Sequence, residues 1–213
     1  MDNRRHLDAL AELGRPARLI ASVPFDVTRA ELERLSAAGA CGARIAVGHA
    51  GAPAFDAIRR FADRLAPVGW HIEFHVRRPP GDQVLAPAEQ GLRDLPVDLC
   101  IAHFASIEVS QGLHQADVAF LCDLLAGGRC WIKLSGGYRL SREPPYRDLI
   151  PFAQKFAAIR SDRLLWGTDW PHVDFKGRMF NSTEQLDCLA QWVPDPVLRR
   201  RILVDNPAAL YRF

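Results

Sequence analysis

The 213-residue sequence lacks any long apolar run, any strong excess of one charge and any C-x-x-C pair. No uninterrupted apolar stretch approaches the ~20 residues that a membrane-spanning helix needs. Lys and Arg number 27 against 25 Asp and Glu, so the formal net charge is only +2, which argues against nucleic acid or a membrane surface as the partner. Residues 1–6 are polar and lack the apolar core of a signal peptide. The composition therefore predicts a cytoplasmic protein.

The five cysteines show no pattern typical of a disulfide framework or a metal site. Their number is odd, and no two of them are separated by two residues. Cys100 and Cys130 lie inside apolar, strand-like runs. We therefore expect reduced thiols that fill the core of an intracellular protein.

Apolar strand-like runs alternate with amphipathic helical stretches along the whole chain. The segment 53–65, for example, begins with a proline and places Phe55, Ile58, Phe61 and Leu65 on one helical face. Such alternation predicts an α/β fold with a parallel sheet in a single domain, residues 1–213. The expected strands are 18–23, 42–47, 71–76, 99–103, 130–135 and 163–169. The expected helices are 5–13, 28–38, 53–65, 85–93, 115–125, 147–159, 183–192 and 196–204, followed by a short turn at 207–211.

Several expected strands carry polar residues on one face. In an open sheet covered by helices on both sides, a strand is apolar on both faces, but residues 71–76 alternate polar and apolar side chains. Polar groups that point together into the interior are typical of the lining of a site in a (β/α) barrel. The alternative is a purely structural network of buried ion pairs, such as Arg44 with Glu73. The inward set is Arg44, Glu73, His75, His103, Lys133, Ser135 and Asp169.

Asp169 is the leading catalytic candidate. It follows the apolar run Leu164–Trp166 and a glycine, and it stands directly before Trp170, Pro171 and His172. A carboxylate at the end of a buried strand has no packing role. The carboxyl ends of parallel strands, in contrast, are where α/β proteins carry their chemistry.

Five segments, in order along the chain, resemble the amidohydrolase-related family of TIM barrels, in particular the 2-pyrone-4,6-dicarboxylate lactonase-like hydrolases. The resemblance implies a (β/α)8 TIM-barrel-like fold. It also implies a hydrolase in which water attacks a lactone or similar ester of a small di- or tricarboxylic acid. The segments are GWHIEF at 69–74, CIAHF at 100–104, WIKLSGGYR at 131–139, WGTDWPH at 166–172 and NPAALY at 206–211.

The resemblance also implies roles for individual residues. Asp169 corresponds to the general base that activates water, and His103 to a residue that holds or polarises the substrate carbonyl. Arg139 corresponds to a carboxylate-binding arginine, because a guanidinium binds carboxylates through two parallel hydrogen bonds. The expected substrate contacts are Arg139, Arg44, His75 and Ser135.

One family feature is missing before residue 18. The family begins with a strand carrying His-x-His and then a second strand, whereas the first histidine here is His6, inside an expected helix. We therefore expect an N-terminally truncated barrel with about six strands, consistent with a length below the ~250 residues typical of such barrels. Because His-x-His supplies metal ligands in the wider superfamily, we expect no metal. The alternative is Zn²⁺ held by His75, His103 and Asp169.

Two other functions stay open from the sequence. One is a metal-dependent decarboxylase or amidohydrolase of the same superfamily. The other is an inactive truncated fragment, whose open sheet edge would favour association into a homo-oligomer. For the hydrolase, the expected partner is a small anionic carboxylate.

Overall fold

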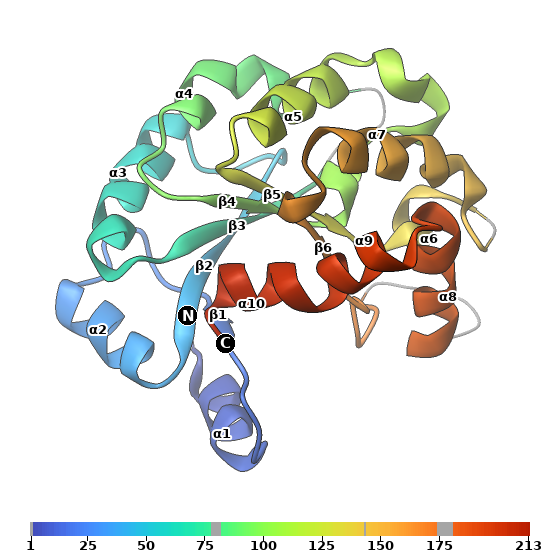
Figure 1. Ribbon diagram of the computed structural model, residues 1–213. Coiled ribbons are helices and arrows are strands. Elements are labelled where there is room, and N and C mark those ends of the chain that lie inside the picture. The colour runs from blue at the N-terminus through green and yellow to red at the C-terminus, as the bar shows by residue number, and fades with distance from the viewer. Residues whose placement is uncertain (1, 78–81, 143, 174–180) are drawn as a thin grey trace.

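The computed structural model describes residues 2–77, 82–142, 144–173 and 181–213. In these ranges the chain forms one six-stranded, all-parallel sheet in which the strands follow one another in sequence order (Figure 1). β1 and β6 do not pair with each other, so the sheet stays open and has the form of a half-barrel. The α/β class and the number of strands agree with the sequence prediction. The strands are β1 (Leu19–Ala21), β2 (Ala40–Val47), β3 (His71–Val76), β4 (Leu99–Ile101), β5 (Cys130–Leu134) and β6 (Leu164–Trp166).

Helices cover the convex side of the sheet, where α2, α3, α4, α5 and α7 form an arc (Figure 1). Local chemistry sets several of their boundaries. The hydroxyl of Thr28 accepts the N–H of Glu31 at 3.3 Å and begins α2, and a reciprocal capping box of Asn181 with Glu184 begins α8. The helices are α1 (Arg4–Glu12), α2 (Arg29–Ala37), α3 (Phe55–Leu65), α4 (Glu89–Arg93), α5 (Ala116–Ala126), α6 (Gly137–Leu140), α7 (Ile150–Arg160), α8 (Ser182–Trp192), α9 (Pro196–Arg200) and α10 (Asn206–Tyr211).

The main core lies between the sheet and this arc of helices. Alternate strand residues such as Ile72, Phe74 and Ile132 are fully buried there and pack with the apolar faces of the helices. The residues between them point to the concave side. This two-sided alternation fixes the strand register, because a slip of one residue would exchange the two faces.

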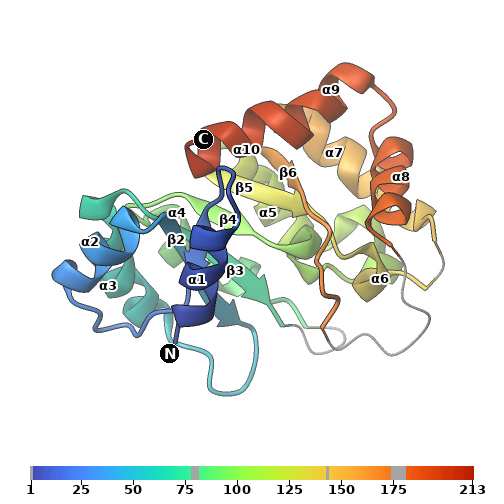
Figure 2. The same cartoon turned by 90° about the horizontal axis from the view of Figure 1, so that it is seen from below.

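The concave side has its own small apolar cluster at the amino end of the strands. Cys100, Trp131 and Leu165 pack there against Leu210 at the end of α10, and Tyr211 lies beside them. α10 runs beside β6 in both ribbon views (Figures 1 and 2). The guanidinium of Arg18 donates to the carbonyl oxygen of Tyr211 at 3.0 Å. The C-terminal helix thus covers one end of the concave face and leaves the carboxyl edge of the strands to other segments.

Buried ion pairs cross the concave face deeper in the sheet. The carboxylate of Glu73 in β3 binds the ammonium of Lys133 in β5, and Arg44 in β2 lies 3.4 Å from its other oxygen. Burial alone would raise the pKa of Glu73, but Lys133, Arg44 and His71 together outweigh it and lower that pKa. Glu73 and Lys133 thus form an ion pair of the kind that the structural interpretation of the inward polar residues predicts.

The structure differs from the sequence prediction mainly at the carboxyl ends of strands. The segments expected as 99–103 and 163–169 end at Ile101 and Trp166. His103 opens a short 3-10 stretch, His103–Ser106, directly after the N–H of Ala102 donates to the carbonyl oxygen of Phe74 in β3 at 2.9 Å. The expected turn at 207–211 is the helix α10. No helix in the described ranges has both the length and the apolar character needed to cross a membrane.

Candidate active site

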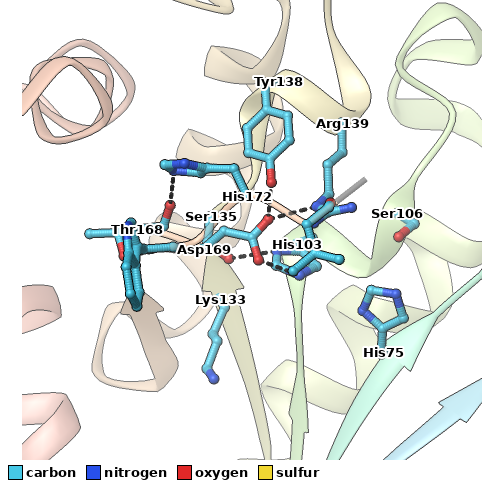
Figure 3. A network of polar contacts seen from close by, with 12 residues as sticks. His75, His103, Ser106, Lys133, Ser135, Tyr138, Arg139, Thr168, Asp169 and His172 are labelled. Atoms are coloured by element: carbon cyan, nitrogen blue, oxygen red, sulfur yellow. Dashed lines mark hydrogen bonds and ion pairs between the residues drawn. The ribbon is translucent and has the colours of Figure 1, made fainter. Parts of the chain in front are cut away.

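Asp169 lies three residues beyond β6, in a tight turn at the carboxyl edge of the sheet (Figure 3). Its backbone has a φ of 59°, and its carbonyl oxygen accepts the N–H of His172 at 2.8 Å. The hydroxyl of Thr168 accepts the N–H of Trp170 at 3.1 Å. A left-handed conformation is uncommon for a residue other than glycine and is often found at functional sites. The turn holds the carboxylate over the carboxyl end of the half-barrel.

Three side chains meet the carboxylate of Asp169, from two sides (Figure 3). The hydroxyl of Tyr138 donates to Oδ2 at 2.5 Å, and Nε of Arg139 donates to the same oxygen at 2.6 Å. On the other side, Nε2 of His103 lies 3.5 Å from Oδ1. The two strong donors are thus concentrated on Oδ2, whereas Oδ1 faces a more distant imidazole.

His103 reaches this position through an unusual backbone. All four residues of the stretch His103–Ser106 have positive φ values between 49° and 58°. Nδ1 of His103 lies 3.0 Å from the hydroxyl of Ser135, which follows β5. Gly136 has a φ of +64°, and a Cβ at this position would lie 2.8 Å from Nδ1 of His103. The absence of a side chain at Gly136 therefore lets the imidazole pack against the backbone.

Tyr138 and Arg139 come from the single-turn helix α6. The ring of Tyr138 packs edge-on against His172, with 5.6 Å between the ring centroids. Nε2 of His172, in turn, lies 3.1 Å from the carbonyl oxygen of Thr168. Nη2 of Arg139 donates to the carbonyl oxygen of Val173 at 3.0 Å. α6 and the turn around Asp169 therefore hold each other in place.

The protonation states of the site follow from these contacts. Burial raises the pKa of Asp169, but His103, Tyr138 and Arg139 together outweigh it, and the pKa is lowered from its ordinary 3.8. Burial lowers the pKa of His103 to about 4, against the opposing effect of Asp169. Burial and then the Asp169 carboxylate raise the pKa of Tyr138. At neutral pH the site therefore holds an ionised carboxylate, a neutral imidazole and a protonated phenol.

His75 and Arg44 form the adjoining part of the site. His75 lies near the end of β3, and its ring meets that of His103 edge-on at 5.6 Å between centroids. Nη2 of Arg44 lies 2.9 Å from Nδ1 of His75. Burial, followed by the charge of Arg44, lowers the pKa of His75 to about 4.

The structure brings most of the predicted site residues together. Asp169, His103, Arg139 and Ser135 form one connected group, and His75 adjoins it. Arg44 contacts Glu73 and His75, which places it at the rim of this group. The sequence also has two adjacent arginines at 77 and 78, which suggest an anionic partner, and residue 78 lies outside the described residues.

The sequence predicted no role for Tyr138 and no catalytic role for His172. Only its position directly before Arg139 pointed to Tyr138, and no helix or strand was expected in this segment. Its direction depends on α6, and a helix of four residues is too short to show a periodic pattern. His172 is buried beside Tyr138, and this contact appears only once the turn at Asp169 is known.

The groups that would form the alternative metal site already have partners among the described residues. Within residues 2–77, 82–142, 144–173 and 181–213, no group of three or more His, Cys, Asp or Glu side chains is arranged to hold one. Nδ1 of His75 accepts from Arg44, so in the neutral ring Nε2 carries the proton and neither nitrogen has a lone pair left for a metal. Two strong donors occupy Oδ2 of Asp169.

Comparison with known proteins identifies the family. The amidohydrolase family Amidohydro_2 matches residues 1–213. The chain belongs to this family. It is 32% identical over 220 residues to a 4-sulfomuconolactone hydrolase of Hydrogenophaga intermedia, covering 99% of this chain and 70% of the relative. It is 31% identical over 232 residues to a 2-pyrone-4,6-dicarboxylate hydrolase of Comamonas testosteroni, covering 99% of this chain and 72% of the relative.

A solved structure shows the same fold. A probable 2-pyrone-4,6-dicarboxylic acid hydrolase of Acinetobacter baumannii, crystallised with citric acid bound, superposes with a TM-score of 0.86. The match covers 100% of this chain and 79% of that one at 27% identity. The family resemblance read from the sequence is therefore confirmed, and both curated relatives are hydrolases of cyclic, anionic compounds by name.

Proposed function

We propose that this amidohydrolase opens the lactone ring of a small anionic compound, with Asp169 as the general base. The observation that carries the proposal is the asymmetric binding of its carboxylate. Tyr138 and Arg139 both donate to Oδ2, so the orientation of the carboxylate is fixed and Oδ1 remains as the oxygen available to water. An ionised carboxylate beside a neutral imidazole can accept a proton at neutral pH.

The reaction follows from this arrangement. Oδ1 of Asp169 removes a proton from water as the water oxygen bonds to the lactone carbonyl carbon. The carbonyl π electrons move to its oxygen and give a tetrahedral oxyanion. Collapse restores the carbonyl and breaks the bond to the ring oxygen, which takes up the proton held by Asp169. The net change is addition of water, which converts the lactone to a hydroxy acid.

Cationic groups beside Asp169 support an anionic substrate. The two bonds that Arg139 makes to Asp169 and Val173 use two of the five N–H groups of its guanidinium. The others can bind a carboxylate or a sulfonate. Both relatives are named for anionic substrates, and the related crystal structure contains a tricarboxylic acid.

Turnover of two substrates by the purified chain tests the proposal. We expect hydrolysis of 2-pyrone-4,6-dicarboxylate, 4-sulfomuconolactone or both. We expect δ-valerolactone, which lacks acid groups, to be turned over at least ~10-fold less efficiently, because each charge-assisted bond is worth about 1.5–3 kcal/mol. Absence of hydrolysis with every anionic lactone tested would overturn the proposal.

Asp169→Asn tests the role of the base. We expect kcat to fall roughly 10²- to 10⁴-fold, because the amide cannot accept the proton, while citrate binding measured by calorimetry changes only a few-fold. Asp162→Asn is the matched control, because Asp162 lies in an exposed ion pair with Arg160. Unchanged turnover by Asp169→Asn would contradict the assignment.

Chelation tests the metal-free mechanism. We expect prolonged treatment with EDTA to leave kcat unchanged, and addition of Zn²⁺ to give no increase. Loss of activity that returns with Zn²⁺ would favour the metal-dependent alternative instead.

A further inference from the structure

Arg44 fixes the hydrogen-bonding state of His75. Nη2 of Arg44 lies 2.9 Å from Nδ1 of His75. A guanidinium has donors only, so Nδ1 must be the acceptor of this bond. In a neutral imidazole the single proton is then on Nε2. His75 is therefore held as an Nε2–H donor.

The second imidazole of the site has a different partner. Nε2 of His103 faces the ionised carboxylate of Asp169 at 3.5 Å, which also accepts only. Its N–H is thus directed at the general base. The ring of His75 stands edge-on to His103, on the side away from Asp169 (Figure 3). The two rings therefore direct their donors to separate places in one site.

The position of His75 suits a group that acts on the carbonyl. It lies one residue before the end of β3, at the carboxyl edge where Asp169 and Arg139 also lie. It is half-buried, so its ring can contact a bound molecule. A neutral imidazole can donate a hydrogen bond without carrying a charge that would pair with the Asp169 carboxylate.

We propose that Nε2–H of His75 donates to the carbonyl oxygen of the substrate and stabilises the oxyanion that forms when water attacks. This inference rests on the proposed lactone hydrolysis and gives to His75 a role that the family resemblance suggested for His103. As the C–O bond to water forms, the carbonyl electron pair moves onto oxygen, and the hydrogen bond from His75 strengthens. His75 keeps its proton throughout, because Asp169 carries the proton from water to the leaving oxygen.

Two isosteric variants test the role of Nε2. The amide nitrogen of Gln lies where Nε2 of histidine lies, and that of Asn lies where Nδ1 lies. We expect His75→Gln to retain kcat within about 10-fold, and His75→Asn to lose roughly 10²- to 10³-fold, as for loss of one oxyanion donor. The matched controls are His114→Gln and His114→Asn, because His114 is exposed and far along the chain from this site. Equal kcat values for the two His75 variants would overturn the proposal.

Nitrogen-15 NMR of the unliganded protein supplies a readout that does not depend on turnover. We expect the Nε2–H tautomer of His75 at pH 7, and a mixture of both tautomers in Arg44→Met. An Nδ1–H tautomer or an imidazolium in the wild-type chain would overturn the proposal. A wild-type chain that hydrolyses the lactones while His75→Asn remains fully active refutes this inference alone. A wild-type chain without any lactone turnover refutes the proposed function and this inference with it.

Discussion

The hydroxyl of Tyr138 lies 2.5 Å from Oδ2 of Asp169 and donates to it. Because Arg139 binds the same oxygen, Tyr138 and Arg139 together orient the carboxylate, and Oδ1 is left facing Nε2 of His103 at 3.5 Å. We expect Tyr138→Phe to lower kcat by roughly 10- to 100-fold and to change KM much less, since a hydrogen bond to a charged group is worth about 1.5–3 kcal/mol. Steady-state kinetics with an anionic lactone measure this effect.

Tyr146→Phe is the control for Tyr138→Phe. It removes the same hydroxyl from a buried tyrosine that contacts Gln185 and is outside the site. We expect its kcat to match the wild type. A large rise in KM for Tyr138→Phe with kcat unchanged would show that Tyr138 binds substrate and does not orient Asp169.

Gly136 leaves the space that the imidazole of His103 occupies. We expect Gly136→Ala to displace His103, because the new Cβ would lie 2.8 Å from Nδ1. The left-handed φ of +64° adds roughly 1–2 kcal/mol of strain. The measurements are kcat and the free energy of unfolding in urea, and both should fall.

Gly14→Ala separates the strain at Gly136 from the clash. Gly14 has a φ of +63°, but a Cβ there would meet no atom within 4 Å. We therefore expect Gly14→Ala to lower the free energy of unfolding by a similar amount through strain and to keep full kcat. Equal kcat values for the two alanine variants would show that Gly136 does not position His103.

The ion pair of Glu73 and Lys133 contributes to the free energy of unfolding. We expect Glu73→Gln to lower the free energy of unfolding by about 3–5 kcal/mol, because it leaves the ammonium of Lys133 buried without its carboxylate. The double variant Glu73→Gln/Lys133→Met should recover most of this loss. Urea titration with fluorescence detection measures both values.

Glu31→Gln is the control, since its exposed pair with Arg34 is worth at most about 1 kcal/mol. A double variant less stable than Glu73→Gln would contradict this account.

His71 makes stability depend on pH. Burial lowers its pKa from 6.5 to about 4, so between these values the unfolded chain binds the proton and the folded chain does not. Its contribution is therefore fully present above pH 6.5 and is lost as the pH falls to about 4, up to roughly 3 kcal/mol. Nε2 of His71 finds no hydrogen-bond partner among the described residues. We expect His71→Leu to be at least as stable as the wild type at pH 7 and to lose less stability on acidification.

Chemical denaturation at a series of pH values from 7 to 4 tests this prediction. Some pH dependence should persist in His71→Leu, because the pKa values of His75 and His103 are also lowered to about 4. An identical slope in His71→Leu and the wild type would show that His71 does not titrate as its burial implies.

The sheet could be predicted from the sequence, because apolar residues on one face of a strand and polar residues on the other show which face packs against the helices. The alternation in residues 71–76 placed Ile72 and Phe74 against the helices and Glu73 and His75 on the concave side, as the structure has them. It also predicted that Asp169, His103 and Arg139 would lie together, since all three follow strands of one parallel sheet.

The sequence could not show which groups in the site contact one another. Arg139 was expected to bind only substrate, yet in the structure it also binds Asp169. This contact depends on the left-handed φ of Asp169 and on the four residues of α6. Neither a single unusual dihedral angle nor one helical turn leaves a periodic signal in the sequence.

The carboxylate of Glu73 in β3 links three strands. It binds Arg44 in the neighbouring strand β2 and Lys133 in β5, on the far side of β4. This cross-brace sits below the turns that carry Asp169 and Arg139. The contacts of Glu73 lie within strands, whereas Asp169 and Arg139 lie beyond the ends of β6 and β5, so the spacing of these strands does not depend on the segments that carry the site. Changes of specificity in the turn after β6 or in α6 should therefore keep Asp169, Tyr138 and Arg139, and should leave the Glu73 ion pairs untouched.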